Sequence, residues 1–135
     1  IYLKDTPLPV GDFDIRRLDL SYAPFVAEHY NGPDCLEYMQ WQINDGAMLG
    51  AFVDGELAGF IGRHDQGALG VLEVLPEYRR RGIATALESA AINRELQEGH
   101  VPYCHLYTDN LASRALQQSL GLSFADKNVW WLYRK

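Results

Sequence analysis

The sequence predicts one mixed α/β (α+β) domain, with a central mixed sheet of about seven strands and about four covering helices. An Asp54-Gly55 pair between two apolar runs is a strong hairpin signal, so the sheet should start antiparallel. Later, apolar runs at 68–75 and 103–108 flank a helical pattern, which predicts a right-handed parallel crossover. The length, 135 residues, suits one domain and is too short for two ordinary ones.

The first half of the chain is expected to supply three strands and two helices. Alternation of Phe13, Ile15 and Leu18 indicates a strand, while Asp34 is a good cap for a helix that Gly46 closes. The expected elements, in order, are a strand over 12–18, a helix from 19 or 21 to 29, a helix over 35–44, and strands over 48–53 and 57–62.

The second half should contain the other strands and the longest helix. Ile83, Leu87 and Ala91 recur at helical spacing, and Gly99 is the expected left-handed cap of that helix. The expected elements are strands over 68–75 and 103–108, helices over 82–98 and 111–120, and two final strands over 122–125 and 129–133.

The net charge, the apolar runs and the cysteine spacing argue against several classes of function. The net charge of −6 argues against nucleic-acid binding. No apolar run approaches the ~20 residues needed to span a bilayer, and no signal peptide is evident, so a cytoplasmic protein without a membrane partner is expected. Cys35 and Cys104 lie too far apart in sequence for a metal knuckle or redox pair, so they are expected to be core thiols. The first residue is Ile1, so residues can be missing upstream.

The loop between the strand at 68–75 and the long helix is the strongest site signal. Three consecutive arginines, Arg79 to Arg81, precede Gly82, at the expected helix start. Free N–H groups and the helix dipole attract anions there, and arginine holds phosphate oxygens with a planar fork of donors. The alternative is a solvated basic turn. From charge alone the two interpretations are equally good.

Spacing favours the phosphate site. Arg79-x-x-Gly82-x-Ala84 resembles the signature of the GNAT acyltransferases, and Asn110-x-x-Ser113-x-x-Leu116 followed by Gly121 adds a second family pattern. The segment from Gly99 to Leu122, the Leu-Pro-Glu-Tyr-Arg run and the terminal tryptophans most resemble the glycine N-acyltransferase-like branch.

The resemblance implies acetyl-CoA or another acyl-CoA as co-substrate, and no metal. Its pyrophosphate would lie on the arginine loop and helix start, and its pantetheine would pair with an edge exposed where the fourth and fifth strands splay apart. The Val74 N–H would then stabilise the oxyanion. Asn110 is equally well explained as a helix cap. The implied CoA-binding residues are Val74, Leu75, Arg79, Arg80, Arg81, Gly82, Ile83, Ala84, Thr85, Asn110 and Ser113.

The catalytic residues depart from the family pattern. Many GNAT enzymes place a tyrosine acid where this chain has Gln117, and the glutamate base of other members aligns with Ala68. Glu73, a carboxylate inside an apolar strand, is the candidate base, and His105 is next.

Other roles stay open. Glu73 is at least as well explained by an ion pair with Arg80, Arg81 or Arg63. His64 and Asp65 are weaker rivals for the base. Trp130 and Trp131 could line an acceptor pocket, although one of two adjacent strand tryptophans is usually core.

The sequence therefore predicts an N-acyltransferase that moves an acetyl or short acyl group from CoA to the amine of a small molecule or amino acid, as a monomer or homodimer. The alternative is a non-catalytic acyl-CoA-binding or regulatory domain, which would keep the arginine loop and lose the proton-handling residues.

Overall fold

The computed structural model describes residues 1–2, 4, 6–30, 35–64, 67–104 and 111–123, with only the backbone of 111–114. Within these ranges every helix is too short or too polar to cross a bilayer.

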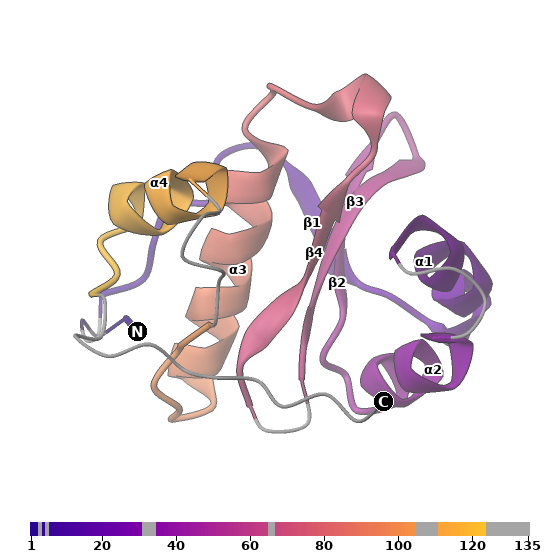
Figure 1. Cartoon of the computed structure of the whole chain (residues 1–135), viewed down its shortest axis with the longest axis horizontal. Helices are drawn as coiled ribbons and strands as arrows, with labels where there is room; N and C mark the ends of the chain where they lie inside the picture. Colours follow the sequence, from indigo (N-terminus) through magenta and orange to yellow (C-terminus); the bar gives the residue numbers. More distant parts are fainter. Residues whose placement is uncertain (3, 5, 31–34, 65–66, 105–110, 124–135) are drawn as a thin grey trace.

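The described strands form one antiparallel sheet in the order β1-β2-β3-β4 (Figure 1). Asp54 and Gly55, at φ +53° and +83°, make the tight turn between the second and third strands, which confirms the predicted hairpin. The strands are β1 (Asp14–Arg17), β2 (Leu49–Val53), β3 (Glu56–Arg63) and β4 (Leu69–Val74).

Helices cover both faces of the sheet, as Figure 1 shows. One face packs against α1 (Ala23–Tyr30), which follows the short η1 turn (Leu20–Tyr22), and against α2 (Leu36–Asn44). The other packs against α3 (Ile83–Gln97), beside which lies α4 (Leu111–Ser119). All four helices agree with the prediction. Each layer buries its own apolar cluster, so the sheet is held from both sides.

The expected count of about seven strands is wrong for the described residues, which form four strands. Cys104 makes only an isolated parallel bridge to Leu69, whose N–H donates to the Tyr103 carbonyl at 2.7 Å. Ser123 exchanges backbone hydrogen bonds with Ile1 but lies in no strand, because one such pair is too short for a ladder. Residues 105–108 and 124–133 of the expected strands, with both C-terminal tryptophans, lie outside the described residues, and so does the predicted splay.

A bulge interrupts β4 where it runs beside β3. The pairing register shifts between Phe60 and Gly62, and Val71 adopts φ +58°. A left-handed conformation is costly for a β-branched residue, so the fold must hold it in place. The bulge re-aims the last residues of β4, which lead into the candidate site.

Candidate functional site

The loop from β4 to α3 presents an exposed helix start. A short helical turn, η3 (Pro76–Tyr78), follows the strand, and the chain then reverses through Arg80, at φ +65°, and Gly82, at φ +81°. The first bond of α3 runs from the Ala86 N–H to the Gly82 carbonyl at 3.0 Å, and no side chain caps the helix. Its first-turn N–H groups and the positive end of its dipole thus suit an anion.

Gly82 is required by its backbone conformation and leaves room for a ligand. A Cβ built on it would meet nothing within 4 Å, while its left-handed φ disfavours other residues. The structure thus adds a conformational reason for the glycine that the sequence has at the start of the helix. Ile83 is buried, Ala84 half-buried and Thr85 exposed in the first turn of the helix.

The three arginines of the loop have different partners. Arg79 folds back along β4, where its Nε donates to the Val74 carbonyl at 3.1 Å and its Nη2 pairs with Glu73 at 3.2 Å. Arg80 and Arg81 donate no side-chain hydrogen bond to any described residue. The Arg81 guanidinium lies 5.5 Å from the centre of the Tyr78 ring. Two exposed guanidinium groups are therefore free to meet an anion.

The backbone of Val74 faces the outer edge of β4. The Leu75 N–H donates inward, to Ala58 of β3 at 2.9 Å. Because successive residues of a strand direct their backbone groups to opposite edges, the Val74 N–H and carbonyl point away from β3. Arg79 now covers that carbonyl. A ligand that pairs with this edge would have to displace the arginine from it.

Glu73 is half-buried and lies on the α1–α2 face of the sheet, since its neighbour Val74 packs toward α3. The ion-pair interpretation named the wrong arginines, because the partner is Arg79. Arg79 follows the η3 turn directly and so reaches back to the strand it has just left. Arg63 is engaged by other carboxylates at the far end of β3.

Some of the remaining predicted residues are described by the structure and the others are not. Ala68 is buried, and His64 receives or donates a 2.7 Å hydrogen bond at Nδ1 with the Tyr38 hydroxyl. Ser113 lies in α4, where only its backbone is described. His105, Asn110 and Asp65 lie outside the described residues, so their predicted roles stay predictions.

A buried carboxylate that the sequence analysis missed lies midway along α3. Glu88, 2% exposed, accepts a 2.9 Å hydrogen bond from Gln117 Nε2 and a long contact from the Cys104 thiol. Burial raises the pKa of Glu88 to about 6 and that of Cys104 to about 12, the nearby carboxylate adding to the shift of the thiol. Glu88 and Glu95 are seven residues apart on one side of the helix, a spacing that could have revealed them.

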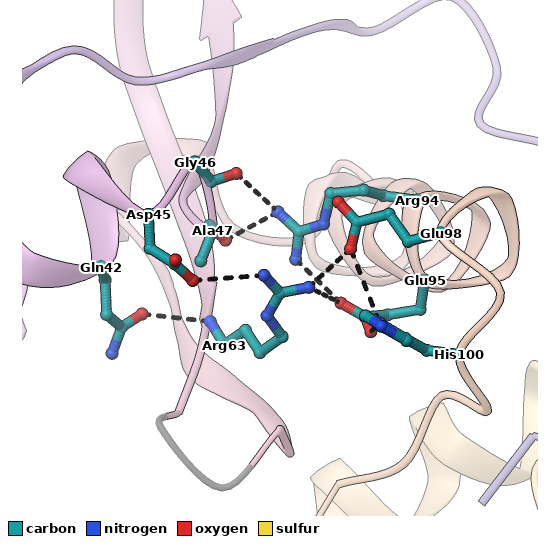
Figure 2. A network of polar contacts seen from close by, with 9 residues as sticks. All are labelled: Gln42, Asp45, Gly46, Ala47, Arg63, Arg94, Glu95, Glu98 and His100. Carbon is teal, nitrogen blue, oxygen red and sulfur yellow. Dashed lines mark hydrogen bonds and ion pairs between the residues drawn. The ribbon is translucent and has the colours of Figure 1, made fainter.

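The C-terminal end of α3 carries a closed network of charges (Figure 2). Arg63 Nη1 contacts Glu95 at 2.7 Å and Glu98 at 2.8 Å, and its Nη2 contacts Asp45 at 3.3 Å. Arg94 donates to the Ala47 carbonyl at 2.7 Å. Among the described residues the donor atoms of Glu95, Glu98 and His100 could enclose a cation, but the Arg63 guanidinium already supplies the positive charge there.

A family profile decides the classification. The profile of the acetyltransferase (GNAT) family matches residues 13–122, most of the chain. The chain belongs to the GNAT family. The resemblance inferred from the arginine loop is thereby confirmed at the level of the family. No curated protein matches the sequence.

Solved structures agree with a GNAT fold. A Drosophila protein is 30% identical with a TM-score of 0.72, over 87% of this chain, which spans only 41% of that protein. The aminoglycoside N-acetyltransferase AAC(6')-Iy, bound to the bisubstrate analogue CoA-S-monomethyl-acetylneamine, has a TM-score of 0.74 at 20% identity, covering 93% of this chain and 100% of its own. A ribosomal-protein-alanine N-acetyltransferase from Brucella melitensis has a TM-score of 0.67 at 23% identity, covering 91% and 99%.

The side chain of Gln117 lies in the protein interior. It is 4% exposed, and its amide oxygen has no hydrogen-bond partner among the described residues. Gln117, which the family resemblance aligns with the tyrosine of many GNAT enzymes, is therefore engaged with the Glu88 carboxylate.

Proposed function

We propose that this GNAT domain transfers an acetyl or short acyl group from CoA to the amine of a small molecule or amino acid. The observation that carries the proposal is the start of α3. There the exposed Arg80 and Arg81 directly precede a left-handed Gly82, whose Cβ position is open, and an uncapped first helical turn. These features suit a pyrophosphate bound by backbone N–H groups.

The rest of the CoA would lie along the outer edge of β4. The pyrophosphate would contact the N–H groups of Gly82, Ile83, Ala84 and Thr85, and the arginines would add charge. The pantetheine amides would then pair with the backbone of Val74, as an added strand does. Arg79 would leave the Val74 carbonyl and join the phosphates. Leu75, Asn110 and Ser113 stay proposed CoA contacts on family resemblance.

The chemistry needs an oxyanion donor and a proton acceptor. The amine nitrogen would attack the thioester carbonyl, whose oxygen would accept a hydrogen bond from the outward Val74 N–H. Glu73, on the α1–α2 face, would take the ammonium proton, and His105 is the alternative base. The C–S bond then breaks and the thiolate takes a proton from water, since a carboxamide at Gln117 is no acid. Positioning of the two substrates would supply much of the rate.

Two glycines of α3 provide a matched test of the binding site. Gly82 and Gly99 flank the helix at φ +81° and +79°, and a Cβ built on either of them would meet nothing within 4 Å. Gly82→Val and Gly99→Val should thus strain the backbone similarly. By calorimetry, acetyl-CoA should no longer bind the Gly82 variant and should bind the Gly99 variant normally. Unchanged affinity in Gly82→Val would refute the site.

Glu73→Gln tests the base. We expect unchanged acetyl-CoA affinity, kcat/KM lower by about 100-fold or more, and a shift of the acidic limb of the pH profile. A variant that keeps its rate and that limb would assign Glu73 to the Arg79 ion pair and move the search to His105.

A non-catalytic acyl-CoA-binding or regulatory domain is the second candidate. Gln117 and Ala68 favour it, because they stand where GNAT enzymes often carry an acid and a base. A thiol-release assay with acetyl-CoA and a panel of amino acids, polyamines and peptides separates the two. Release with any acceptor identifies an enzyme, whereas binding without release identifies a binder.

The finer assignment rests on resemblance. The segment from Gly99 to Leu122 and the Leu75–Arg79 run support the glycine N-acyltransferase-like branch, whose acceptors are amino acids. The similar structures act, by their names, on aminoglycosides and on the alanine of a ribosomal protein. We assign residues 1–135 to one domain of a cytoplasmic protein, as a monomer or homodimer, in which Cys35 and Cys104 are thiols and form no disulfide.

A further inference from the structure

A cavity of about 450 Å³ opens between α1, the turn joining β2 to β3, and η3. This cavity borders the candidate site through η3, which leads into the arginine loop, and through Leu75, which directly follows β4. The lining residues include Tyr22, Phe25, Glu56, Leu75, Glu77 and Tyr78.

The lining of this cavity combines aromatic rings with negative charge. Tyr22, Phe25 and Tyr78 supply the rings, and the exposed carboxylates of Glu56 and Glu77 lie at its rim. The Tyr78 hydroxyl donates to Glu56 at 3.2 Å. Burial and then the neighbouring carboxylates raise the pKa of Tyr78, so this hydroxyl stays protonated. No lysine or arginine is among the described lining residues, and the other titratable groups of the lining are His29 and Tyr22.

Such a surface attracts organic cations. Ammonium and guanidinium groups bind over aromatic faces, and nearby carboxylates add Coulombic attraction. The structure already has one example, because the Arg81 guanidinium lies over the Tyr78 ring. A carboxylate ligand would meet like charge at Glu56 and Glu77.

The cavity lies on the same face of β4 as the proposed base. Leu75 lines it, and Glu73 precedes Leu75 by two residues, so both side chains point to the α1–α2 face. Their Cα atoms are about 7 Å apart along the strand. An amine near Glu73 could therefore extend a short chain into the cavity.

We propose that this cavity binds the second cationic group of the acyl acceptor, so that the acceptor is a diamine or a larger polyamine. The inference rests on the proposed acyl transfer and makes it specific. The reacting amine lies at Glu73, and the distal ammonium group lies among Tyr22, Phe25 and Tyr78 with Glu56 and Glu77 as counter-charges. Of the two acceptor classes in the proposed function, this inference selects small-molecule amines over amino acids, because a carboxylate on the acceptor is disfavoured here, and it therefore departs from the amino-acid acceptors of the glycine N-acyltransferase-like branch.

Three acceptors of equal length isolate the distal group. They are 1,4-diaminobutane, 1-pentylamine and 4-aminobutanoate, whose distal groups are an ammonium, a methyl and a carboxylate. In the thiol-release assay the diamine should exceed pentylamine in kcat/KM by about tenfold, mainly through KM, and 4-aminobutanoate should be the poorest acceptor. A preference for pentylamine or for 4-aminobutanoate would overturn the inference.

A pair of nearly isosteric substitutions that removes both carboxylate charges provides the second arm. The double variant Glu56→Gln/Glu77→Gln should abolish the advantage of the diamine over pentylamine, whereas Asp54→Asn, in the same hairpin but outside the lining, should keep it. Calorimetry of 1,4-diaminobutane with CoA present gives a readout without turnover. Binding that the double variant loses, without thiol release by the wild type, would refute acyl transfer and keep the cation site. Equal diamine binding and equal selectivity in wild type and double variant, or none in either, would refute the cation site.

Discussion

Arginines lie at both ends of α3, but they differ in burial. At the C-terminal end, the side chains of Arg63 and Arg94 are 15% and 8% exposed and contact carboxylates or carbonyls of the elements around them. At the N-terminal end, the side chain of Arg79 is 58% exposed, and Arg80 and Arg81 have no side-chain hydrogen bond among the described residues. The same residue type is largely buried among charged and carbonyl groups at one end, where Arg94 Nε and Nη2 still lack a hydrogen-bond partner among the described residues, and is exposed at the other.

Burial explains the difference. A buried guanidinium must have partners, because an unpaired charge in the interior costs several kcal/mol. Arg63 therefore joins Asp45, beside α2, to Glu95 of α3, and so ties the helices of both faces to the end of the sheet (Figure 2). Exposed arginines lack this requirement and can pair with a ligand. One end of the helix holds the layers together, and the other is available for binding.

Loss of Glu95 should have the largest effect on stability. Glu95→Ala leaves the mostly buried Arg63 guanidinium without its closest counter-ion, and we expect the free energy of unfolding to fall by about 3–5 kcal/mol. Urea denaturation measures it. Glu98→Ala removes a more exposed carboxylate of the same network and should cost under about 1 kcal/mol. An equal loss of stability in the two variants would show that the difference in burial between Glu95 and Glu98 has no effect.

Glu88→Gln should stabilise the protein by about 2 kcal/mol above pH 7. The pKa of Glu88 is about 6 in the folded state, against 4.5 for the free group, so the folded state binds the proton more tightly. The stability that this proton contributes is complete below about pH 4.5 and is lost as the pH rises through about 6. The variant's advantage should therefore grow from pH 4 to 7, as urea denaturation at each pH would show. A difference in the free energy of unfolding between variant and wild type that does not change with pH would contradict this prediction.

Arg79→Ala should weaken acetyl-CoA binding by about 1–3 kcal/mol, because it removes a charge-assisted contact to phosphate. Its effect on the free energy of unfolding should be under about 1 kcal/mol, since the ion pair with Glu73 is largely exposed. Arg16→Ala is the control, because Arg16 also pairs with a carboxylate on the surface, Asp14 at 3.2 Å. Equal affinity of both variants for acetyl-CoA, measured by calorimetry, would show that Arg79 makes no contact that contributes to binding.

Gln117→Ala should have the smallest effect on turnover. A carboxamide cannot act as an acid, so kcat per folded molecule should change only slightly. Stability should fall, because Glu88 loses its hydrogen-bond donor. Steady-state kinetics normalised to folded protein measures the first effect. A collapse in kcat with intact CoA binding would show that the amide takes part, for example by ordering a water.

Local patterns were sufficient for most elements of the described fold. The Asp54-Gly55 turn, the helix periods and the glycine caps depend on residues close in sequence, and each was found where expected. The count of strands was not predictable in this way. A short apolar run forms a strand only when a neighbour completes its ladder, and Cys104 and Ser123 each have a single backbone pairing.

The candidate site shows the same division. The sequence by itself determined the arginine loop, its glycine and the helix start, because these are consecutive residues with a local physical role. Only the tertiary structure decided that Glu73 pairs with Arg79, that Glu88 is buried against Gln117, and that rings of α1 meet carboxylates of the hairpin and η3 in one cavity. The contact of Glu88 with Gln117 and the lining of the cavity join residues far apart in the chain. The Glu73–Arg79 pair spans six residues and forms because the η3 turn folds the chain back along β4. The energy of each contact depends on burial, which packing sets.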